Sequence, residues 1–296
     1  MSLFALKLVA VLTMTIDHIG LVFGQQGWNL LPFPSSVLRT VGRISFPLFA
    51  YCLARGWHTT QNRQKYFQNL LCGAVASQIP FSMAFCSDNL AAGETNAYFF
   101  HFDGIYCLFA IVAVSSYWIF ILNNKWKNSV LIAGAAAILP GIRLQIHGVW
   151  ILGETGNVFY TFLAAFLCLY SLQARDSLTR TKRIWLFLAL PILLVGYGLP
   201  ADYGTGLVGL ALIVGLSILS TNRQQAIFLA MWSLLYYGVI LRNPYSMLVC
   251  AVSCGFVLLY DPKIPSCFRA KRFFYWYYPI HLFLLGGINV GLRFLG

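Results

Sequence analysis

The first apolar stretch of the chain, Leu3 to Gly24, carries Lys7, Asp17 and His18 inside a run that is otherwise long and hydrophobic enough to cross a membrane. Ionisable side chains are costly within a membrane span, so they usually serve a functional site or pair with groups inside the protein. Eleven residues at about 100° each return Lys7 and His18 to nearly the same helix face. The stretch therefore predicts a membrane-spanning helix with a polar stripe, roughly 16 Å long between these two residues.

Composition extends this interpretation to the whole chain. Of its 296 residues, 59% are hydrophobic and 9% are charged, whereas a typical soluble domain has about 25% charged residues. The apolar runs are continuous, while the strands of a membrane barrel alternate over about ten residues. We expect an all-α fold, a polytopic integral membrane helix bundle of about ten to eleven transmembrane helices.

Eleven hydrophobic segments support this count, and one of them, 128–142, is short enough to be re-entrant rather than spanning. They are 3–24, 36–57, 66–86, 99–122, 128–142, 155–174, 184–199, 203–220, 225–241, 244–260 and 273–295. No soluble domain or long linker separates them. We therefore expect a single domain over residues 1–296.

Lys and Arg gather in alternate loops between these segments, and acidic residues lie in the intervening loops. By the positive-inside rule the N-terminus is cytoplasmic, with Lys7 toward the cytoplasm and Asp17 and His18 toward the outer leaflet. This topology accounts for the formal net charge of +12. We expect no nucleic-acid partner, because no basic stripe with interleaved aromatic residues lies on a soluble segment.

Two groups of residues near the predicted outer side are candidates for chemistry. His18 can act as a general base, since the unperturbed imidazole pKa of about 6.5 lies close to neutral pH. The alternative is a structural Asp17–Arg pair beside a hydrogen-bonded core histidine. Arg39 and Arg43, one helical turn apart, can clamp an anion or hold Asp17 ionised; a simpler role for Arg39 is to extend to the lipid headgroups.

The last hydrophobic segment adds a second histidine. His281 lies two residues after Pro279. Because proline has no backbone N–H, a carbonyl of the preceding turn loses its helical hydrogen bond, and His281 beside it can face a water-filled cavity. The alternative is a hydrogen bond from His281 to a neighbouring helix. The aromatic run 273–278 suits the membrane interface. Asp202 and Tyr203 are either residues of the functional site or part of an ordinary turn. No spacing of Cys, His or acidic residues indicates a metal site, and we expect no metal.

Several stretches, taken together and in order, resemble the TraX family, membrane proteins named for the F-pilin acetylase. The most specific elements are DHIG in KLVAVLTMTIDHIGLVF (7–23), GR-x-x-FP-x-F in LRTVGRISFPLFAYCLARGWHT (38–59) and YP-x-H in FFYWYYPIHLFLL (273–285). Residues 87–150 look like an insertion relative to that pattern. The first segment is also similar to the opening helix of acyltransferase-3-type membrane enzymes, whose basic residue, alanine and histidine correspond to Lys7, Ala10 and His18.

The resemblance implies an acetyltransferase in the bacterial inner membrane, crossing it several times. It would move an acetyl group from cytoplasmic acetyl-CoA to an acceptor, such as the N-terminal amine of a pilin-like or secreted peptide. His18 would be the general base, Asp17 and Arg43 would orient or polarise, and His281 would assist with a proton. The candidates for binding donor or acceptor are Lys7, Arg39, Arg43, Arg55, Asp202, Tyr203, Lys271 and Tyr278.

Two alternatives stay open. An enzyme of the same fold can acylate a hydroxyl of a cell-envelope sugar or a lipid, because the acceptor pocket leaves no signature in the sequence. A membrane transporter also places ionisable groups within its spans.

Overall fold

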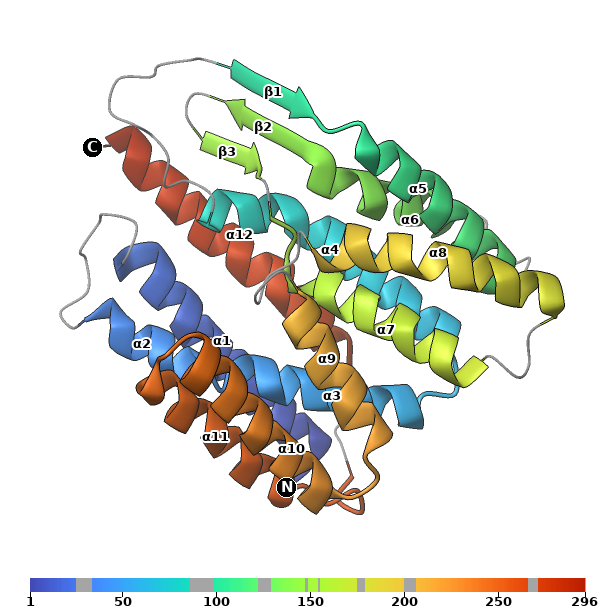
Figure 1. Cartoon of the computed structure of the whole chain (residues 1–296). Coiled ribbons are helices and arrows are strands. Elements are labelled where there is room, and N and C mark those ends of the chain that lie inside the picture. The colour runs from blue at the N-terminus through green and yellow to red at the C-terminus, as the bar shows by residue number, and fades with distance from the viewer. Residues whose placement is uncertain are drawn as a thin grey trace. The chain divides into compact units, whose positions relative to one another are not determined.

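The computed structural model describes residues 1–24, 34–85, 98–121, 129–146, 149–153, 155–174, 179–199, 206–265 and 271–295. Helices make up most of the described chain (Figure 1). By its internal contacts the chain divides into two compact units, each built from two separate parts of the sequence. Unit 1 comprises Met1–Thr59 and Ala211–Asn289, and unit 2 comprises Thr60–Leu210 and Val290–Gly296.

Unit 1 is formed by helices from both ends of the chain. Its helices are α1 (Leu3–Gly24), α2 (Ser35–Gly42), α3 (Ser45–Thr59), most of α9 (Leu207–Ile218), α10 (Asn222–Ser233), the π-helix η5 (Leu234–Ile240), α11 (Pro244–Leu258) and most of α12 (Lys271–Leu295). Helix α1 packs against α2 and α3, and α11 packs against α10, α2 and α3. The bounds of α1 equal those predicted for the first apolar segment.

The second predicted segment, 36–57, is interrupted within unit 1. Helix α2 ends at Gly42, and the amides of Arg43 and Ile44 donate to carbonyls only three residues back, at 3.1 and 3.2 Å. The carbonyl of Ile44 instead accepts a hydrogen bond from Ser253 Oγ of α11 at 3.3 Å. A break in an apolar helix is tolerated when the freed backbone groups find partners inside the protein, so α11 supports the break.

Unit 2 contains helices and one small sheet. Its elements are α4 (Arg63–Phe85), β1 (Tyr98–Phe102), α5 (Ile105–Ser116), the π-helix η2 (Tyr117–Ile121), α6 (Ser129–Ile138), the 3-10 turn η3 (Leu139–Gly141), β2 (Ile142–Ile146), β3 (Val149–Leu152), α7 (Val158–Ala174) and α8 (Arg180–Gly198). The sheet is antiparallel in the order β1-β2-β3, with His101 opposite Arg143. The all-α prediction did not include this sheet.

The sheet changes one predicted segment. The apolar run 99–122 begins as the strand β1, and its helix starts only at Ile105. The local reason is the Asp103–Gly104 turn, in which Asp103 Oδ1 accepts a hydrogen bond from the amide of Ile105 at 3.1 Å. Aromatic residues such as those of 98–102 also favour strands. Hydropathy does not distinguish a strand from a helix in so short a run.

A buried polar network ties the sheet side of unit 2 to its helices. Gln78 of α4 is fully buried; it donates to the carbonyl of Thr155 at 2.9 Å and accepts from the side chain of Asn157 at 2.9 Å. Asn157 also donates to the carbonyl of Ala74 at 2.8 Å. Since each partner is satisfied, the network holds the start of α7 on α4.

Three helical stretches are long and apolar enough to cross a membrane: Leu3–Gly24, Ser35–Thr59 and Arg180–Gly198. Five shorter helical stretches are apolar as well. The described structure thus confirms the predicted helix bundle of membrane type. Four statements stay predictions: the number of spans, the cytoplasmic N-terminus, the single domain and the insertion at 87–150.

Candidate functional site

Two histidines from opposite ends of the chain meet in unit 1. His18 lies on α1 and His281 on α12, and His18 Nδ1 is 2.7 Å from His281 Nε2. Their ring planes are within 6° of parallel, with centroids 5.0 Å apart. A nitrogen separation of 2.7 Å is too short for face-to-face stacking, so the rings meet edge to edge through a hydrogen bond. The sequence predicted both histidines as site residues but not their contact.

The backbone of α12 determines which nitrogen carries each proton in this pair. His281 Nδ1 lies 2.9 Å from the carbonyl oxygen of Tyr277, which can only accept, so Nδ1 carries the proton. In the neutral pair His281 Nε2 is then an acceptor, and His18 Nδ1 donates to it. The remaining nitrogen, His18 Nε2, therefore carries a lone pair, which is the property required of a general base.

Tyr277 and Thr15 support this arrangement, and neither was predicted. The ring of Tyr277 stacks on His281, with centroids 5.0 Å apart and planes 16° from parallel. Thr15 Oγ1 donates to the carbonyl of Val11 at 2.8 Å, so in the 2.7 Å contact with Tyr277 it accepts from the phenol. The helical spacing was a usable signal, because Thr15 precedes His18 by three residues and Tyr277 precedes His281 by four.

Tyr278, a predicted binding residue, lies beside both imidazoles. Tyr278 is 5% exposed. Its ring lies edge to face against the His281 ring, with centroids 5.4 Å apart, and against the His18 ring, with centroids 6.1 Å apart. The aromatic residues 273–278 were assigned to the membrane interface by the sequence. Two of them, Tyr277 and Tyr278, instead form the walls of the histidine pair.

Asp17 is paired with an arginine, as one alternative predicted. It is 6% exposed, and its Oδ1 lies 3.6 Å from Nε of Arg39 on α2. Arg43, the other predicted arginine, lies just beyond the end of α2, and its guanidinium carbon is 6.0 Å from the ring centroid of Tyr237. The pairing with Arg39 supplies the positive charge that a buried carboxylate needs.

Gly42 sets how closely α2 approaches Asp17. An added Cβ at this position would lie 2.6 Å from Asp17 Oδ1. No side chain larger than hydrogen fits there without moving Asp17. The glycine of the GR-x-x-FP-x-F pattern therefore has a steric role in this structure, because it lets the backbone of α2 lie against the buried acid.

Lys7 and Arg55 lie in unit 1 beside other aromatic residues. Lys7 Nζ is 5.5 Å from the ring centroid of Phe274, and the Arg55 guanidinium carbon is 5.2 Å from that of Tyr260. On the helix α1, Lys7 and His18 are eleven residues and roughly 16 Å apart. Lys7 is thus separated from the histidine pair along α1.

Three predicted residues cannot be placed beside these groups. Asp202 and Tyr203 lie outside the described residues, and α12 begins at Lys271, whose side chain also lies outside them. Among the described residues, no three His, Cys, Asp or Glu side chains are placed to hold a metal ion.

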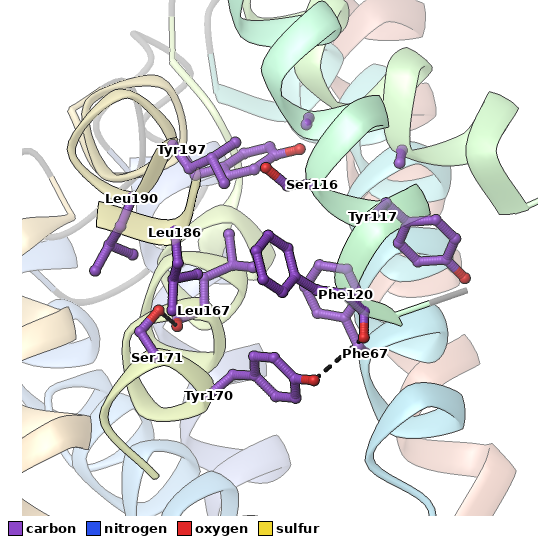
Figure 2. Close-up of a pocket in the computed structure, with 13 residues that line it drawn as sticks. Phe67, Ser116, Tyr117, Phe120, Leu167, Tyr170, Ser171, Leu186, Leu190 and Tyr197 are labelled. Atoms are coloured by element: carbon purple, nitrogen blue, oxygen red, sulfur yellow. Dashed lines mark hydrogen bonds between the residues drawn. The ribbon is translucent and has the colours of Figure 1, made fainter. Parts of the chain in front are cut away.

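Unit 2 has a pocket of a different kind (Figure 2). Its lining is mainly apolar, and the hydroxyl groups of Ser116, Tyr117, Tyr170 and Ser171 have hydrogen-bond partners within unit 2. Tyr170 donates to the carbonyl of Phe120 at 3.2 Å, the dashed line in Figure 2, and Ser116 accepts from Trp185 at 3.2 Å. None of the described residues that line it carries a carboxylate, imidazole or amine. The pocket therefore lacks the groups for acid–base chemistry that the histidine pair has.

Comparison with known proteins points to one family. The family model described as "TraX protein" matches residues 2–152 and 149–289. A curated protein, "Probable fimbrial assembly protein FimC, serogroup H1" of Dichelobacter nodosus, is 33% identical over 94 residues, which are 31% of this chain and 36% of that protein. The match thus spans about a third of the relative's length. No solved structure matches the chain, and the resemblance to acyltransferase-3-type enzymes stays a prediction.

Proposed function

Since this chain belongs to the TraX family, we propose that it is a membrane-embedded acetyltransferase. It transfers an acetyl group from acetyl-CoA to the N-terminal amine of a pilin-like or secreted peptide. The observation that carries the proposal is the hydrogen-bonded chain from the Tyr277 carbonyl through His281 to His18. The name of the matched relative, a fimbrial assembly protein, favours a pilin-related acceptor over a sugar or a lipid.

The proposed reaction uses His18 Nε2 as the base. The acceptor amine attacks the thioester carbonyl carbon, the new C–N bond forms, and the C–S bond breaks. The proton leaves the amine for His18 Nε2, and it ends on the departing thiolate. His281 accepts a hydrogen bond from His18 throughout, which stabilises the imidazolium that forms, as a carboxylate does in other acyl-transfer sites.

Asp17 and Arg39 have a supporting role in this proposal. Asp17 adjoins His18 in α1 and is buried, so its charge needs the nearby guanidinium. The pair holds α1 to α2 beside the base.

The placement in the cell follows from the same proposal. The three helical stretches that can cross a membrane and the alternating loop charges favour a multi-pass protein of the bacterial inner membrane. The N-terminus then faces the cytoplasm, where acetyl-CoA is found.

The test is acetyl transfer by the purified protein in nanodiscs. Radiolabelled acetyl-CoA is mixed with a pilin-like peptide whose N-terminus is free or blocked, and label in the peptide is measured. We expect label only with the free amine. His18→Asn should lower kcat roughly 100-fold or more, the range of general-base catalysis.

The control variant is His58→Asn. His58 also belongs to unit 1, but its Nε2 lies 2.7 Å from the carbonyl oxygen of Ser217 on α9 and has no part in the histidine pair. Its loss should leave the rate within about twofold. The proposal fails if the wild-type protein transfers no label, or if His18→Asn and His58→Asn have equal rates.

A further inference from the structure

Two helices of unit 2 begin with clusters of positive charge. Helix α4 begins with Arg63 and Lys65, and α8 begins with Arg180, Lys182 and Arg183. Lys65, Arg180 and Arg183 are exposed, and the other two are partly exposed. All five belong to unit 2, whereas the histidine pair belongs to unit 1. The proposed reaction therefore gives these cations no role.

Contacts at the two ends of α7 bring these helix starts together. Near the end of α7, Gln173 Oε1 accepts a hydrogen bond from Nη2 of Arg63 at 3.4 Å. Near its start, Tyr160 stacks on Tyr197, which lies close to the end of α8, with ring centroids 6.0 Å apart. Helices α7 and α8 are thus antiparallel neighbours. The start of α8 therefore lies at the same end of unit 2 as the start of α4.

The described part of unit 2 contains one acidic residue, Asp103, to set against these cations. Asp103 precedes α5, and at the far end of α5 Ser116 accepts a hydrogen bond from Trp185 of α8 at 3.2 Å. The 12 residues of α5, roughly 18 Å of helix, separate Asp103 from the start of α8. In the sequence, Arg175 and Asp176 between α7 and α8 cancel in charge. The surplus of positive charge favours an anionic partner.

An exposed apolar surface begins directly after these cations. Ile184, Phe187 and Leu188 of α8 are each more than half exposed, and so is Leu172 near the end of α7. Helix α8 is one of the stretches long and apolar enough to cross a membrane. Trp185 suits the boundary between headgroups and hydrocarbon. A phospholipid with an anionic headgroup matches both the charge and the apolar surface, whereas a soluble anion matches only the charge.

We propose that the basic end of unit 2, formed by Arg63, Lys65, Arg180, Lys182 and Arg183, binds an anionic phospholipid. Its phosphate rests on the guanidinium and ammonium groups, and its acyl chains lie along the exposed apolar face of α8. The alternating loop charges predict that this end faces the cytoplasm, where anionic lipids give the membrane surface a negative potential. The proposal does not depend on acetyl transfer.

The experiment compares the lipids that the full-length protein retains. Protein is released from nanodiscs of phosphatidylcholine and phosphatidylglycerol into a native mass spectrometer, and the ratio of the two retained lipids is measured. The wild type should prefer phosphatidylglycerol. Arg180→Gln with Arg183→Gln should lower this preference about 25-fold, at about fivefold for each cation near an anionic headgroup. Arg180→Lys with Arg183→Lys keeps the charge and should lose less.

The matched control is Arg223→Gln with Lys263→Gln. These exposed residues belong to unit 1, and their loops are also predicted to face the cytoplasm, so the pair removes equal charge from the same predicted side. It should keep the wild-type preference. Thermal unfolding checks that each variant is folded. If the α8 variant does not fold, the wild type decides: phosphatidylglycerol should raise its unfolding temperature, and high salt should reduce that increase.

A loss of preference confined to the α8 variant supports the lipid site. Equal retention of both lipids by the wild type overturns it, and so does a preference that survives in the folded α8 variant. An equal loss in the control overturns it as well, because general attraction to the leaflet then explains the binding. Displacement of the lipid by glycerophosphoglycerol, the same headgroup without acyl chains, would overturn the assignment to a lipid.

Discussion

Replacing Gly42 by alanine tests whether the close approach of α2 to Asp17 organises the candidate site. The added Cβ would lie 2.5 Å from Asp17 Cγ and 2.6 Å from its Oδ1, well inside van der Waals contact. Asp17 is buried, and its Oδ1 is 3.6 Å from Arg39. Either α1 and α2 separate, or the carboxylate turns away from the guanidinium.

The expected magnitude follows from two opposing terms. Overpacking a close contact of this kind costs about 1–3 kcal/mol. Alanine in a helix recovers about 0.5–1 kcal/mol relative to glycine. We expect a net loss on the order of 1 kcal/mol in the free energy of unfolding, together with slower acetyl transfer, since Asp17 adjoins His18 in α1.

Gly255→Ala is the matched control. Gly255 is a residue of α11 in the same unit, and an added Cβ there has no atom within 4 Å. Thermal unfolding in detergent, followed by tryptophan fluorescence, should place Gly42→Ala below the wild type and Gly255→Ala at or above it. The steric argument is refuted if Gly42→Ala unfolds at the same temperature as Gly255→Ala.

Two further pairs of variants probe the helix contacts. Tyr277→Phe and Thr15→Val each remove one side of the same 2.7 Å hydrogen bond. A double-mutant cycle of unfolding free energies should give a coupling of about 0.6 to 1.7 kcal/mol, from the average to the maximum for hydrogen bonds between membrane helices. Additive effects of the two substitutions would contradict the bond. In unit 2, Gly73→Ala brings a Cβ within 2.7 Å of Phe159 and should lose about 1–3 kcal/mol, whereas Gly134→Ala, 3.4 Å from its nearest neighbour, should unfold like the wild type.

The histidine pair also explains why the last helix carries its aromatic residues where it does. Tyr277 contributes a carbonyl, a ring face and a hydroxyl to the support of His281. In the proposed transferase it acts through His281 and does not touch the acceptor. A general rule for aromatic residues at the end of a span therefore describes their position but not their contacts.

Local properties of the sequence determined the positions of the helices. The apolar run Leu3–Gly24 became α1 with the same bounds, and the ionisable residues within apolar runs marked where the candidate site lies. Hydropathy and helical periodicity are sums over neighbouring residues, so they need no knowledge of distant partners. They did not distinguish β1 from the start of α5, because a run of five residues has too few positions to reveal a period.

Tertiary packing alone decided the partners. His18 and His281 are 263 positions apart, and their contact depends on how α1 and α12 pack. Asp17 meets Arg39 because α2, which ends at Gly42, lies close against α1. Hydrogen bonds and ion pairs extend over a few ångströms, and helix packing determines which residues come within that reach. The sequence thus determined which residues are available for chemistry, and the packing of distant helices determined which of them meet.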